Sequence, residues 1–301
     1  MKTVREIRNI LEACRYVDVH IHTHLCDGTS DMTVANIAAR ASEQQLGAIV
    51  LTPHFHKQVS DATETLYTDT DEAILGELRE QIEHYNRTDG SVKILLSAEV
   101  DILSPKGDLS LSPSNVVEHS LDLITPTMNY NPSLPLCAVH LTYGKDMHHL
   151  HESGEYAEMA ERAGGVGAVL EAMYDTEVNA LLHAPYPAML GHFFAAHSAA
   201  TNGHNWFGAT KEHLPLMQAG ADRVLTACQK TSAMIDVTGI HPKEGQSLAD
   251  KRLEDGFLYE FQCDVLAKCR RADIPSFPGS DAHRLLRVGQ CKLYHELYDL
   301  P

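Results

Sequence analysis

Two histidines near the start of the chain are spaced so that they can act together. They are His20 and His22, in the stretch Asp18-Val19-His20-Ile21-His22. In an extended strand, residues two apart share a face, so the two imidazoles point into the same space. Two imidazoles on one face can chelate a metal ion. The spacing therefore predicts a metal site at the end of a first strand.

Other metal-binding side chains also follow apolar stretches of the sequence. His54 comes after residues 48–52, Glu99 stands near the end of residues 92–100, and Asp281 and His283 follow residues 274–280. Mixed nitrogen and oxygen ligands suit zinc, manganese or iron better than calcium. The sequence thus supplies ligands for more than one divalent ion.

Strand-like and helix-like segments alternate along the chain, which is typical of a parallel α/β fold. Strands are expected at residues 16–22, 48–52, 92–100, 121–125, 180–183, 233–237 and 274–280. Helices are expected from a cap at Ser30 or Asp31 to Gly47, and at about residues 69–85, 155–174, 214–231 and 259–271. In parallel barrels the carboxyl ends of the strands meet at one mouth, so we expect the polar side chains to gather there.

Length and composition indicate one globular domain over residues 1–301. Hydrophobic residues make up 44% of the chain and charged residues 22%, which is ordinary for a globular protein. The formal net charge of −17 disfavours binding to nucleic acid polymers and anionic membranes. Bound cations would still attract a small anionic substrate to the site itself.

The cysteines and the amino terminus predict a cytoplasmic protein. The 7 cysteines are scattered, odd in number and without Cys-x-x-Cys spacing, which fits reduced thiols. Of these, Cys26 is the one considered as a metal neighbour. The first residues are too charged for a signal peptide, and no apolar run reaches membrane-spanning length.

Taken together, the motifs resemble the PHP (polymerase and histidinol phosphatase) family. They are Asp18-x-His20-x-His22-Thr23, Thr52-Pro53-His54, Glu99-Val100-Asp101-Ile102-Leu103, Leu182-His183-Ala184-Pro185 and Gly279-Ser280-Asp281-Ala282-His283. The resemblance implies a distorted, TIM-like barrel of seven strand–helix units that holds two or three divalent metals and acts as a phosphoesterase. It is nearest to the stand-alone histidinol-phosphatase-like members.

Carried over by position, the resemblance also implies a set of ligands. A first metal is expected at His20, His22, Glu99 and Asp281, the residues to which the catalytic role is assigned. Glu99 is expected to bridge to a second metal that His183 also binds. A third is expected at Asp27, His54 and His283.

One ligand position of the family, after the fourth strand, has two candidates. Direct continuation of residues 121–125 reaches Asn129, a poor metal ligand. The later stretch Ala138-Val139-His140-Leu141 looks more like the family's own segment. His140 is therefore favoured, with Asn129 as the alternative that would weaken the second metal.

The remaining polar residues receive secondary roles. Arg284, Arg287 or His241 is expected to contact the phosphate of a substrate. Asp18, interpreted as lying on the same strand face as His20 and His22, is expected to orient a ligand. Other histidines of the chain are interpreted as loop or surface residues: His148, His149, His151, His192, His197 and His204.

These features favour hydrolysis of a small phosphomonoester by metal-bound hydroxide. Histidinol phosphate, another phosphorylated metabolite and a nucleotide all stay open as substrates. An amidohydrolase also begins with His-x-His, but the Glu99 carboxylate and the Asp281–His283 pair fit it less well. A non-catalytic metal-binding module and a nuclease beside a polymerase are further alternatives, the latter disfavoured by the acidic charge.

Overall fold

Short parallel strands alternate with helices in the computed structural model of the chain. The structure describes residues 2–26, 28–55, 72–111, 121–127, 155–194, 209–238, 247, 249–250, 256–292 and 294. The strands are β1 (Val17–Ile21), β2 (Ala48–Leu51), β3 (His54–Phe55), β4 (Lys93–Leu96), β5 (Glu99–Asp101), β6 (Thr125–Thr127), β7 (Met189–Leu190), β8 (Met234–Val237) and β9 (Ser276–Pro278). The helices are α1 (Val4–Glu12), α2 (Val34–Glu43), α3 (Glu72–Thr88), α6 (Glu155–Arg162), α7 (Val166–His183), α8 (Leu214–Thr231) and α10 (Phe257–Arg271). Short 3-10 turns are η2 (Lys211–His213) and η3 (Leu285–Arg287). The expected α/β class is confirmed.

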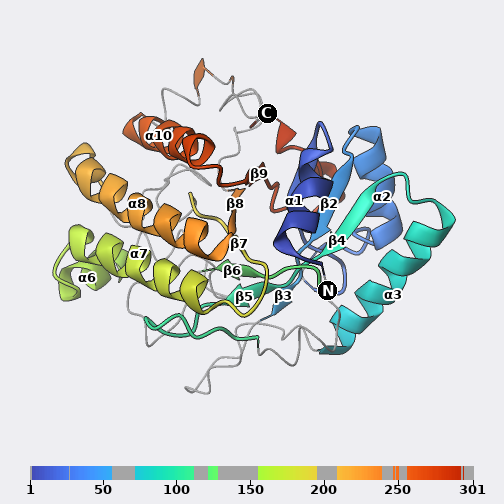
Figure 1. Cartoon of the computed structure of the whole chain (residues 1–301), viewed down its shortest axis with the longest axis horizontal. Coiled ribbons are helices and arrows are strands. Elements are labelled where there is room, and N and C mark those ends of the chain that lie inside the picture. Colours follow the sequence, from blue (N-terminus) through green and yellow to red (C-terminus); the bar gives the residue numbers. More distant parts are fainter. Residues whose placement is uncertain are drawn as a thin grey trace.

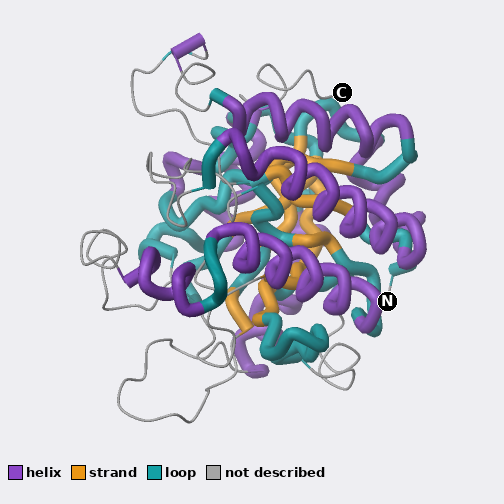
Figure 2. The backbone as a smooth tube through the Cα atoms, turned by 90° about the vertical axis from the view of Figure 1, so that its left-hand side faces the viewer, coloured by secondary structure: helices purple, strands orange, loops and turns teal. Residues whose placement is uncertain are grey.

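The strands form groups ordered β1-β2-β4, β3-β5-β6 and β7-β8-β9, all with parallel pairing. Isolated parallel bridges join Ile124 to Ala188 and Ile21 to Ala282, so the first strand meets the chain just after the last one. In Figure 1, α2 and α3 lie on one side of the strands, and α6, α7, α8 and α10 lie on the other. Figure 2 shows the strands in the middle of the molecule with helices outside them.

Both faces of the strands are apolar and each face packs into its own cluster. The inner cluster joins α1 to residues from strands all round the molecule; its members are Ile7, Leu11, Val17, Val19, Ala48, Val50, Leu95, Leu123, Met189, Met234 and Phe277. The outer cluster joins the alternate strand residues, such as Ile49 and Leu96, to the surrounding helices. Because residues alternate between the faces of a strand, a run that is apolar throughout indicates a strand covered on both sides.

A change of register in β1 decides which way its histidines point. Val17 and Asp18 pair with Ala48 and Ile49, but Ile21 pairs with Leu51, so three steps on β1 match two on β2. Val17 and Val19 therefore belong to the inner cluster while Ile21 belongs to the outer one. A bulge of this kind re-aims the side chains that follow it. It turns His20 and His22 to the inner side.

The limits of α2 differ from those expected. Thr33, and not Ser30 or Asp31, is the cap, because its Oγ1 accepts a hydrogen bond of 3.2 Å from the backbone N of Asn36. The left-handed residue after the helix is Gln45, with φ of 60°. Gly47 instead leaves room for Cys14, whose Sγ would lie 2.7 Å from a Cβ at that position.

The expected strand at residues 180–183 is wrong, because this stretch forms the last turn of α7. Ala180 and Leu181 are buried on the inner side of the helix, whereas Leu182 is 45% exposed. An apolar run of four residues fits a helix end as well as a strand. Pro185 then ends the helix, and the true strand follows at β7. Similarly, the strand expected at residues 121–125 lies at β6, slightly later.

Some further expectations concern features outside the strands. The cysteines in the described ranges carry free thiols: Cys14, Cys26, Cys228, Cys263, Cys269 and Cys291. Among the helices described above, none has both the length and the apolar composition that crossing a bilayer requires.

The interface between α7 and α8 contains a buried carboxyl group, that of Glu177. Its side chain is 2% exposed, and within the described part of the chain its Oε2 has no hydrogen-bond partner. Burial raises the pKa of Glu177 to about 8 from an ordinary 4.5. Nearby, a Cβ on Gly220 would collide with the Tyr174 ring, which shows how closely the two helices approach.

Ionisation of Glu177 should make the protein less stable as the pH rises. The unfolded carboxyl loses its proton near pH 4.5 and the folded one near pH 8, so the folded state holds the extra proton between these values. Between pH 5 and pH 8 the free energy of unfolding should fall by roughly 3 kcal/mol more in the wild type than in Glu177→Gln. Urea unfolding at several pH values measures this difference.

The control for this measurement is Glu161→Gln, which changes an exposed glutamate on α6. Its pH dependence should match that of the wild type. Parallel stability curves for the wild type and Glu177→Gln would contradict the assignment of a raised pKa to Glu177.

Candidate metal centre

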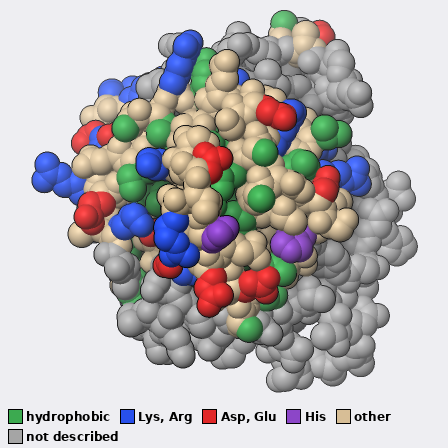
Figure 3. All heavy atoms as spheres, turned by 90° about the vertical axis from the view of Figure 1, so that its right-hand side faces the viewer, with side chains coloured by type: hydrophobic (Ala, Val, Ile, Leu, Met, Phe, Trp, Pro, Cys, Tyr) green, Lys and Arg blue, Asp and Glu red, His purple; other side chains and the backbone are tan. Residues whose placement is uncertain are grey.

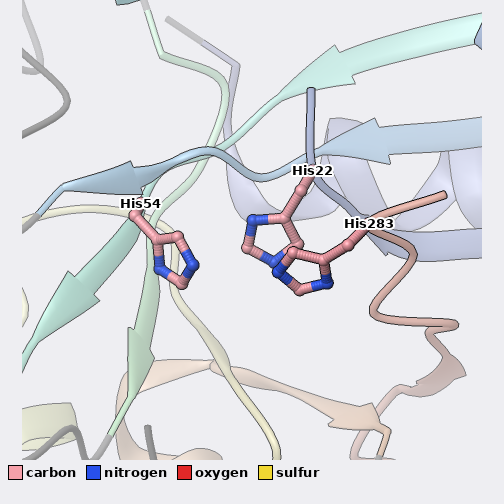
Figure 4. Close-up of side chains that lie close together, drawn as sticks. All are labelled: His22, His54 and His283. Carbon is pink, nitrogen blue, oxygen red and sulfur yellow. The ribbon is translucent and has the colours of Figure 1, made fainter. Parts of the chain in front are cut away.

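Histidines and carboxylates gather at the carboxyl ends of the strands. Groups of ligand atoms within 4.8 Å of one another occur, among the described residues, at His22, His54 and His283, at His20, His22 and Asp281, and at His20, Glu99 and His192. Figure 4 shows the rings of His22, His54 and His283 turned toward one another, with His22 following β1 and His283 following β9. The rings of His22 and His283 stack with centroids 3.9 Å apart.

Glu99, the first residue of β5, lies at the centre of this cluster. Its Oε2 is 3.3 Å from His20 Nε2, 3.5 Å from His22 Nε2 and 3.1 Å from His54 Nδ1. Its Oε1 is 3.7 Å from His192 Nδ1. One buried carboxylate thus contacts four imidazoles from three separate segments of the chain. A carboxylate with both oxygens among nitrogen ligands is suited to bridge two cations.

Asp281 is the second carboxylate of the cluster. Its Oδ1 lies 3.0 Å from His22 Nε2, and its Oδ2 lies 3.8 Å from His192 Nε2. Burial alone would raise the pKa of Asp281, but the hydrogen bond from His22 and the charges of His283, His192 and His20 hold that pKa well below its usual value. The group is therefore an anion at neutral pH.

The pKa of His20 is shifted in the opposite direction to that of Asp281, so both groups favour their charged forms. Burial lowers the pKa of this imidazole, yet hydrogen bonds to Asp236 and Glu99 and the charges of both carboxylates outweigh burial and raise the pKa well above its usual value. The cluster therefore attracts positive charge. Closely spaced imidazole nitrogens and carboxylate oxygens, buried except at the partly exposed Asp281 and His283, fit divalent ions such as zinc, manganese or iron.

Two residues of the cluster have left-handed backbone conformations, His192 with φ of 48° and Asp281 with φ of 51°. Side chains other than glycine rarely adopt this region, although aspartate tolerates it better than most. After Asp281, the Ala282 carbonyl accepts a 3.0 Å hydrogen bond from the His22 backbone N. Before His192, a Cβ on Gly191 would lie 2.7 Å from Thr125 Cγ2, so only glycine fits there. Two of the left-handed non-glycine residues of the described structure thus lie where ligands enter the site.

The structure brings together most of the residues that the motifs indicated. His20, His22, His54, Glu99, Asp281 and His283 all belong to the cluster. Asp27, His140, Asn129 and His241 lie outside the described residues, as do His148, His149, His151, His197 and His204. Their expected roles stay predictions.

His183 is not in this cluster, and the expectation that it follows a strand is wrong. It is the last residue of α7, its side chain is exposed, and its Nδ1 lies 2.9 Å from the Lys106 carbonyl oxygen. Because a carbonyl oxygen only accepts, Nδ1 of His183 donates this hydrogen bond, which ties the ring to the loop at Lys106. The motif match at Leu182-His183 thus selected a helix end.

His192 occupies the place expected of His183, although it was interpreted as a loop histidine. It is 4% exposed and its ring stacks on that of His20 with centroids 4.5 Å apart. The signal in the sequence was Met189-Leu190-Gly191-His192, an apolar pair followed by glycine and histidine. The loop interpretation rested on the irregular sequence that His192 shares with His197 and His204, around Asn202-Gly203.

Asp18 does not share the face of His20 and His22, because the bulge in β1 separates them. Its carboxylate accepts 2.9 Å hydrogen bonds from the backbone N of Ser280 and of Gly289. Burial raises the pKa of Asp18 to about 6. The group therefore fastens the segment that carries Asp281 and does not orient a histidine ring.

Four neighbours of the cluster complete the description. Cys26 Sγ accepts a hydrogen bond of 3.3 Å from the backbone N of His54. Arg284 and Arg287 are exposed at the start and end of the turn that follows His283. Asp236, on the strand expected at residues 233–237, lies with its Oδ2 2.8 Å from His20 Nδ1.

The fold of the chain is similar to that of solved structures. A candidate histidinol phosphatase from Listeria monocytogenes matches over 91% of this chain and 97% of its own, with a TM-score of 0.62 and 16% identity. The histidinol phosphate phosphatase of Lactococcus lactis, solved with zinc, L-histidinol and phosphate, matches over 95% of this chain and 93% of its own, with a TM-score of 0.55 and 12% identity. The chain has a histidinol-phosphatase-like PHP fold.

Comparison of the sequence with protein-family models and with curated proteins gives no match. At identities of 16% and 12%, the structural likeness establishes the histidinol-phosphatase-like fold and not the reaction. The chemistry has to be argued from the cluster itself.

The pair His192 and His183 offers a direct test of the ligand assignment. His192→Ala should weaken zinc binding by about tenfold or more, because it removes an imidazole from the buried cluster. His183→Ala should bind zinc as the wild type does. Chelator competition with the purified proteins measures both affinities, and equal losses in the two variants, or a loss only in His183→Ala, would contradict the assignment.

Proposed function

We propose that this protein is a metal-dependent hydrolase of small phosphomonoesters. The observation that carries the proposal is the central position of Glu99 among four imidazoles, with Asp281 beside them. The fold adds support, because the similar Lactococcus lactis structure holds zinc, L-histidinol and phosphate. A cytoplasmic location fits the free thiols of the described cysteines.

The residues divide into groups that would hold two or three divalent ions. His20, His22, Glu99 and Asp281 would hold the first, with these residues in the catalytic role. Glu99 and His192 would share the second with His20 close by, and His140 stays a candidate for it. His54 and His283 would hold a third, together with Asp27.

When bound, such ions lower the pKa of a water molecule, so that hydroxide exists near neutral pH, and they offset the charge that develops on the phosphoryl group. The chain's own contribution is to hold the ligands before the substrate arrives. Buried strands fix Glu99 and His20, which are both 0% exposed. Asp281 is kept ionised by the surrounding imidazoles. No protein nucleophile is needed.

We also propose that the strands close into a barrel of seven strand–helix units and that residues 1–301 form one domain. The support is the continuity of pairing, since bridges link β6 to β7 at Ile124 and Ala188, and β1 to the end of β9 at Ile21 and Ala282. In such a barrel β2 and β3 act as one strand, and β4 and β5 as another, because only two residues separate each pair. The site then lies at the mouth formed by the strand ends.

A small substrate is favoured over a nucleic acid polymer. The formal net charge of −17 repels a phosphate backbone at long range. On the face seen in Figure 3, the described acidic and basic side chains are interspersed. Divalent ions bound in the cluster would concentrate positive charge there, where it would act on a single phosphate. Histidinol phosphate, another phosphorylated metabolite or a nucleotide meets this description.

Removal of metal should abolish activity and its return should restore it. The purified protein would be stripped with a chelator and assayed on a panel of phosphorylated metabolites, before and after addition of zinc, manganese or iron. We expect turnover only with metal restored, because bound ions would supply both a hydroxide nucleophile near neutral pH and compensation for the developing charge. Equal turnover in the stripped and restored protein would contradict the proposal.

The same assay applies to variants of the cluster. His20→Ala and Asp281→Ala should each lose turnover completely while the circular dichroism spectrum stays that of a folded α/β protein. His183→Ala, which changes a histidine outside the cluster, serves as the matched control and should keep full activity. Full activity in both cluster variants would rule out a metal-dependent mechanism at this site.

The arginines after His283 should affect substrate affinity more than turnover. Arg284 and Arg287 are exposed beside the cluster, and either can form paired hydrogen bonds with a phosphate. An alanine substitution of the arginine that binds phosphate should raise both KM and the inhibition constant of inorganic phosphate about tenfold. Its effect on kcat should be smaller. Arg271→Ala, an exposed arginine at the end of α10, is the control. Unchanged constants in both Arg284→Ala and Arg287→Ala would contradict this role.

A further inference from the structure

A carboxylate on β8 holds the far side of the His20 ring. Asp236 is 0% exposed, and its Oδ2 lies 2.8 Å from His20 Nδ1. The opposite nitrogen of the same ring, Nε2, faces Glu99 Oε2 at 3.3 Å and Asp281 Oδ1 at 3.8 Å. His20 is thus held between a carboxylate outside the cluster and the carboxylates inside it.

Asp236 is itself fixed from its other side. Thr238, the residue just after β8, donates a hydrogen bond from Oγ1 to Asp236 Oδ1. Thr238 is 1% exposed. Each carboxylate oxygen of Asp236 therefore has one partner, and together these partners set the plane of the carboxylate. A fully buried carboxylate held in this way has little freedom to rotate.

The backbone makes room for this contact at Gly279. A Cβ built at Gly279 would lie 2.5 Å from Asp236 Oδ1 and 2.8 Å from His20 Cβ, and it would also collide with Thr238 Oγ1. The φ of Gly279 is not in the left-handed region, so space, and not conformation, explains the glycine. Residues from β1, from β8 and from just after β9 thus meet at the hydrogen bond between His20 Nδ1 and Asp236 Oδ2.

We propose that Asp236 is a positioning residue that keeps the proton of His20 on Nδ1 and thereby presents Nε2 to a divalent metal ion. A histidine ligand bound through Nε2 must carry its proton on Nδ1, and an anionic acceptor there fixes both the tautomer and the ring orientation. Because it assumes a metal ion at Nε2 of His20, this role of Asp236 rests on the proposed function.

The sharpest variant is Asp236→Asn, which keeps the shape and changes the hydrogen-bonding pattern. Thr238 donates to the oxygen of residue 236, so the amide oxygen of asparagine would take that bond and its NH₂ would face His20 Nδ1. An NH₂ donor there favours the tautomer with the proton on Nε2, the nitrogen that should bind metal. Asp236→Asn should therefore weaken zinc binding by about 10-fold to 100-fold.

A second pair of variants separates positioning from packing. Thr238→Val keeps the shape of the side chain and removes the donor, whereas Thr238→Ser keeps the donor and removes a methyl group. Thr238→Val should weaken zinc binding by about threefold to tenfold and Thr238→Ser should restore wild-type affinity. If Asp236→Asn does not fold, this pair decides the question alone.

The experiment measures zinc affinity by chelator competition and the imidazole ¹⁵N chemical shifts of the zinc-loaded proteins by NMR. The expected result is a loss of affinity in Asp236→Asn and Thr238→Val, together with a shift of the His20 tautomer signal. Glu177→Gln, a change in a buried carboxyl between α7 and α8, should leave both readouts unchanged. Equal affinity in folded Asp236→Asn and the wild type, or equal loss in Thr238→Val and Thr238→Ser, would overturn the role of Asp236.

These outcomes are distinct from failure of the proposed function. A wild-type protein that binds zinc but hydrolyses no phosphomonoester would contradict the proposed reaction and leave the zinc measurements on Asp236 decisive. A wild-type protein that binds no zinc, manganese or iron would overturn both proposals. If the wild type binds zinc and turns over substrate, and Asp236→Asn binds zinc with the same affinity, only the role of Asp236 would be overturned.

Discussion

The burial of Glu99 is the constraint on which the rest of the structure depends. Placing an ionised carboxylate inside a protein costs several kcal/mol unless opposite charge and hydrogen bonds compensate for it. Here the compensation comes from His20, His22, His54 and His192, which belong to three different segments of the chain. Those segments can surround one carboxylate only if their strands run parallel and end at the same level. Compensation of the buried charge of Glu99 thus depends on parallel strands whose ends converge around it.

Local irregularities make this convergence possible. The inner side of β1 is apolar at Val17 and Val19 but carries ligands from His20 onward, and the bulge between them is what joins the two patterns on one face. At the other side of the cluster, the left-handed Asp281 lets the chain turn back so that Ala282 pairs with Ile21. Regular strands would supply the apolar core but would point the ligands outward.

The sequence predicted the parts of the site that depend on local pattern. Spacing and apolar context were enough for His20, His22, His54, Glu99, Asp281 and His283, which the structure gathers, while their binding of metal stays a prediction. An apolar run followed by a histidine occurs before both His183 and His192, so this local pattern does not distinguish them. Residues 180–183 are helical because they end α7, which packs against α8. Asp236 was not found because its contact with His20 crosses from β8 to β1, and the bulge that displaces Asp18 from the histidine face is also set by pairing between strands.

The position of the ligands along the chain has a consequence for folding. His22 and Asp281 contact each other across almost the whole sequence, and the bridge between Ile21 and Ala282 is where the first and last strands meet. Contacts so distant in sequence carry a large loop-closure entropy and form late. A cation bound between them would therefore stabilise the last step of assembly, since ligands that do not yet face each other cannot bind it. Asp18 also stabilises the junction between the first and last strands, from the outer side of β1. Its carboxylate accepts hydrogen bonds from the backbone N of Ser280 and of Gly289, and these bonds need no metal.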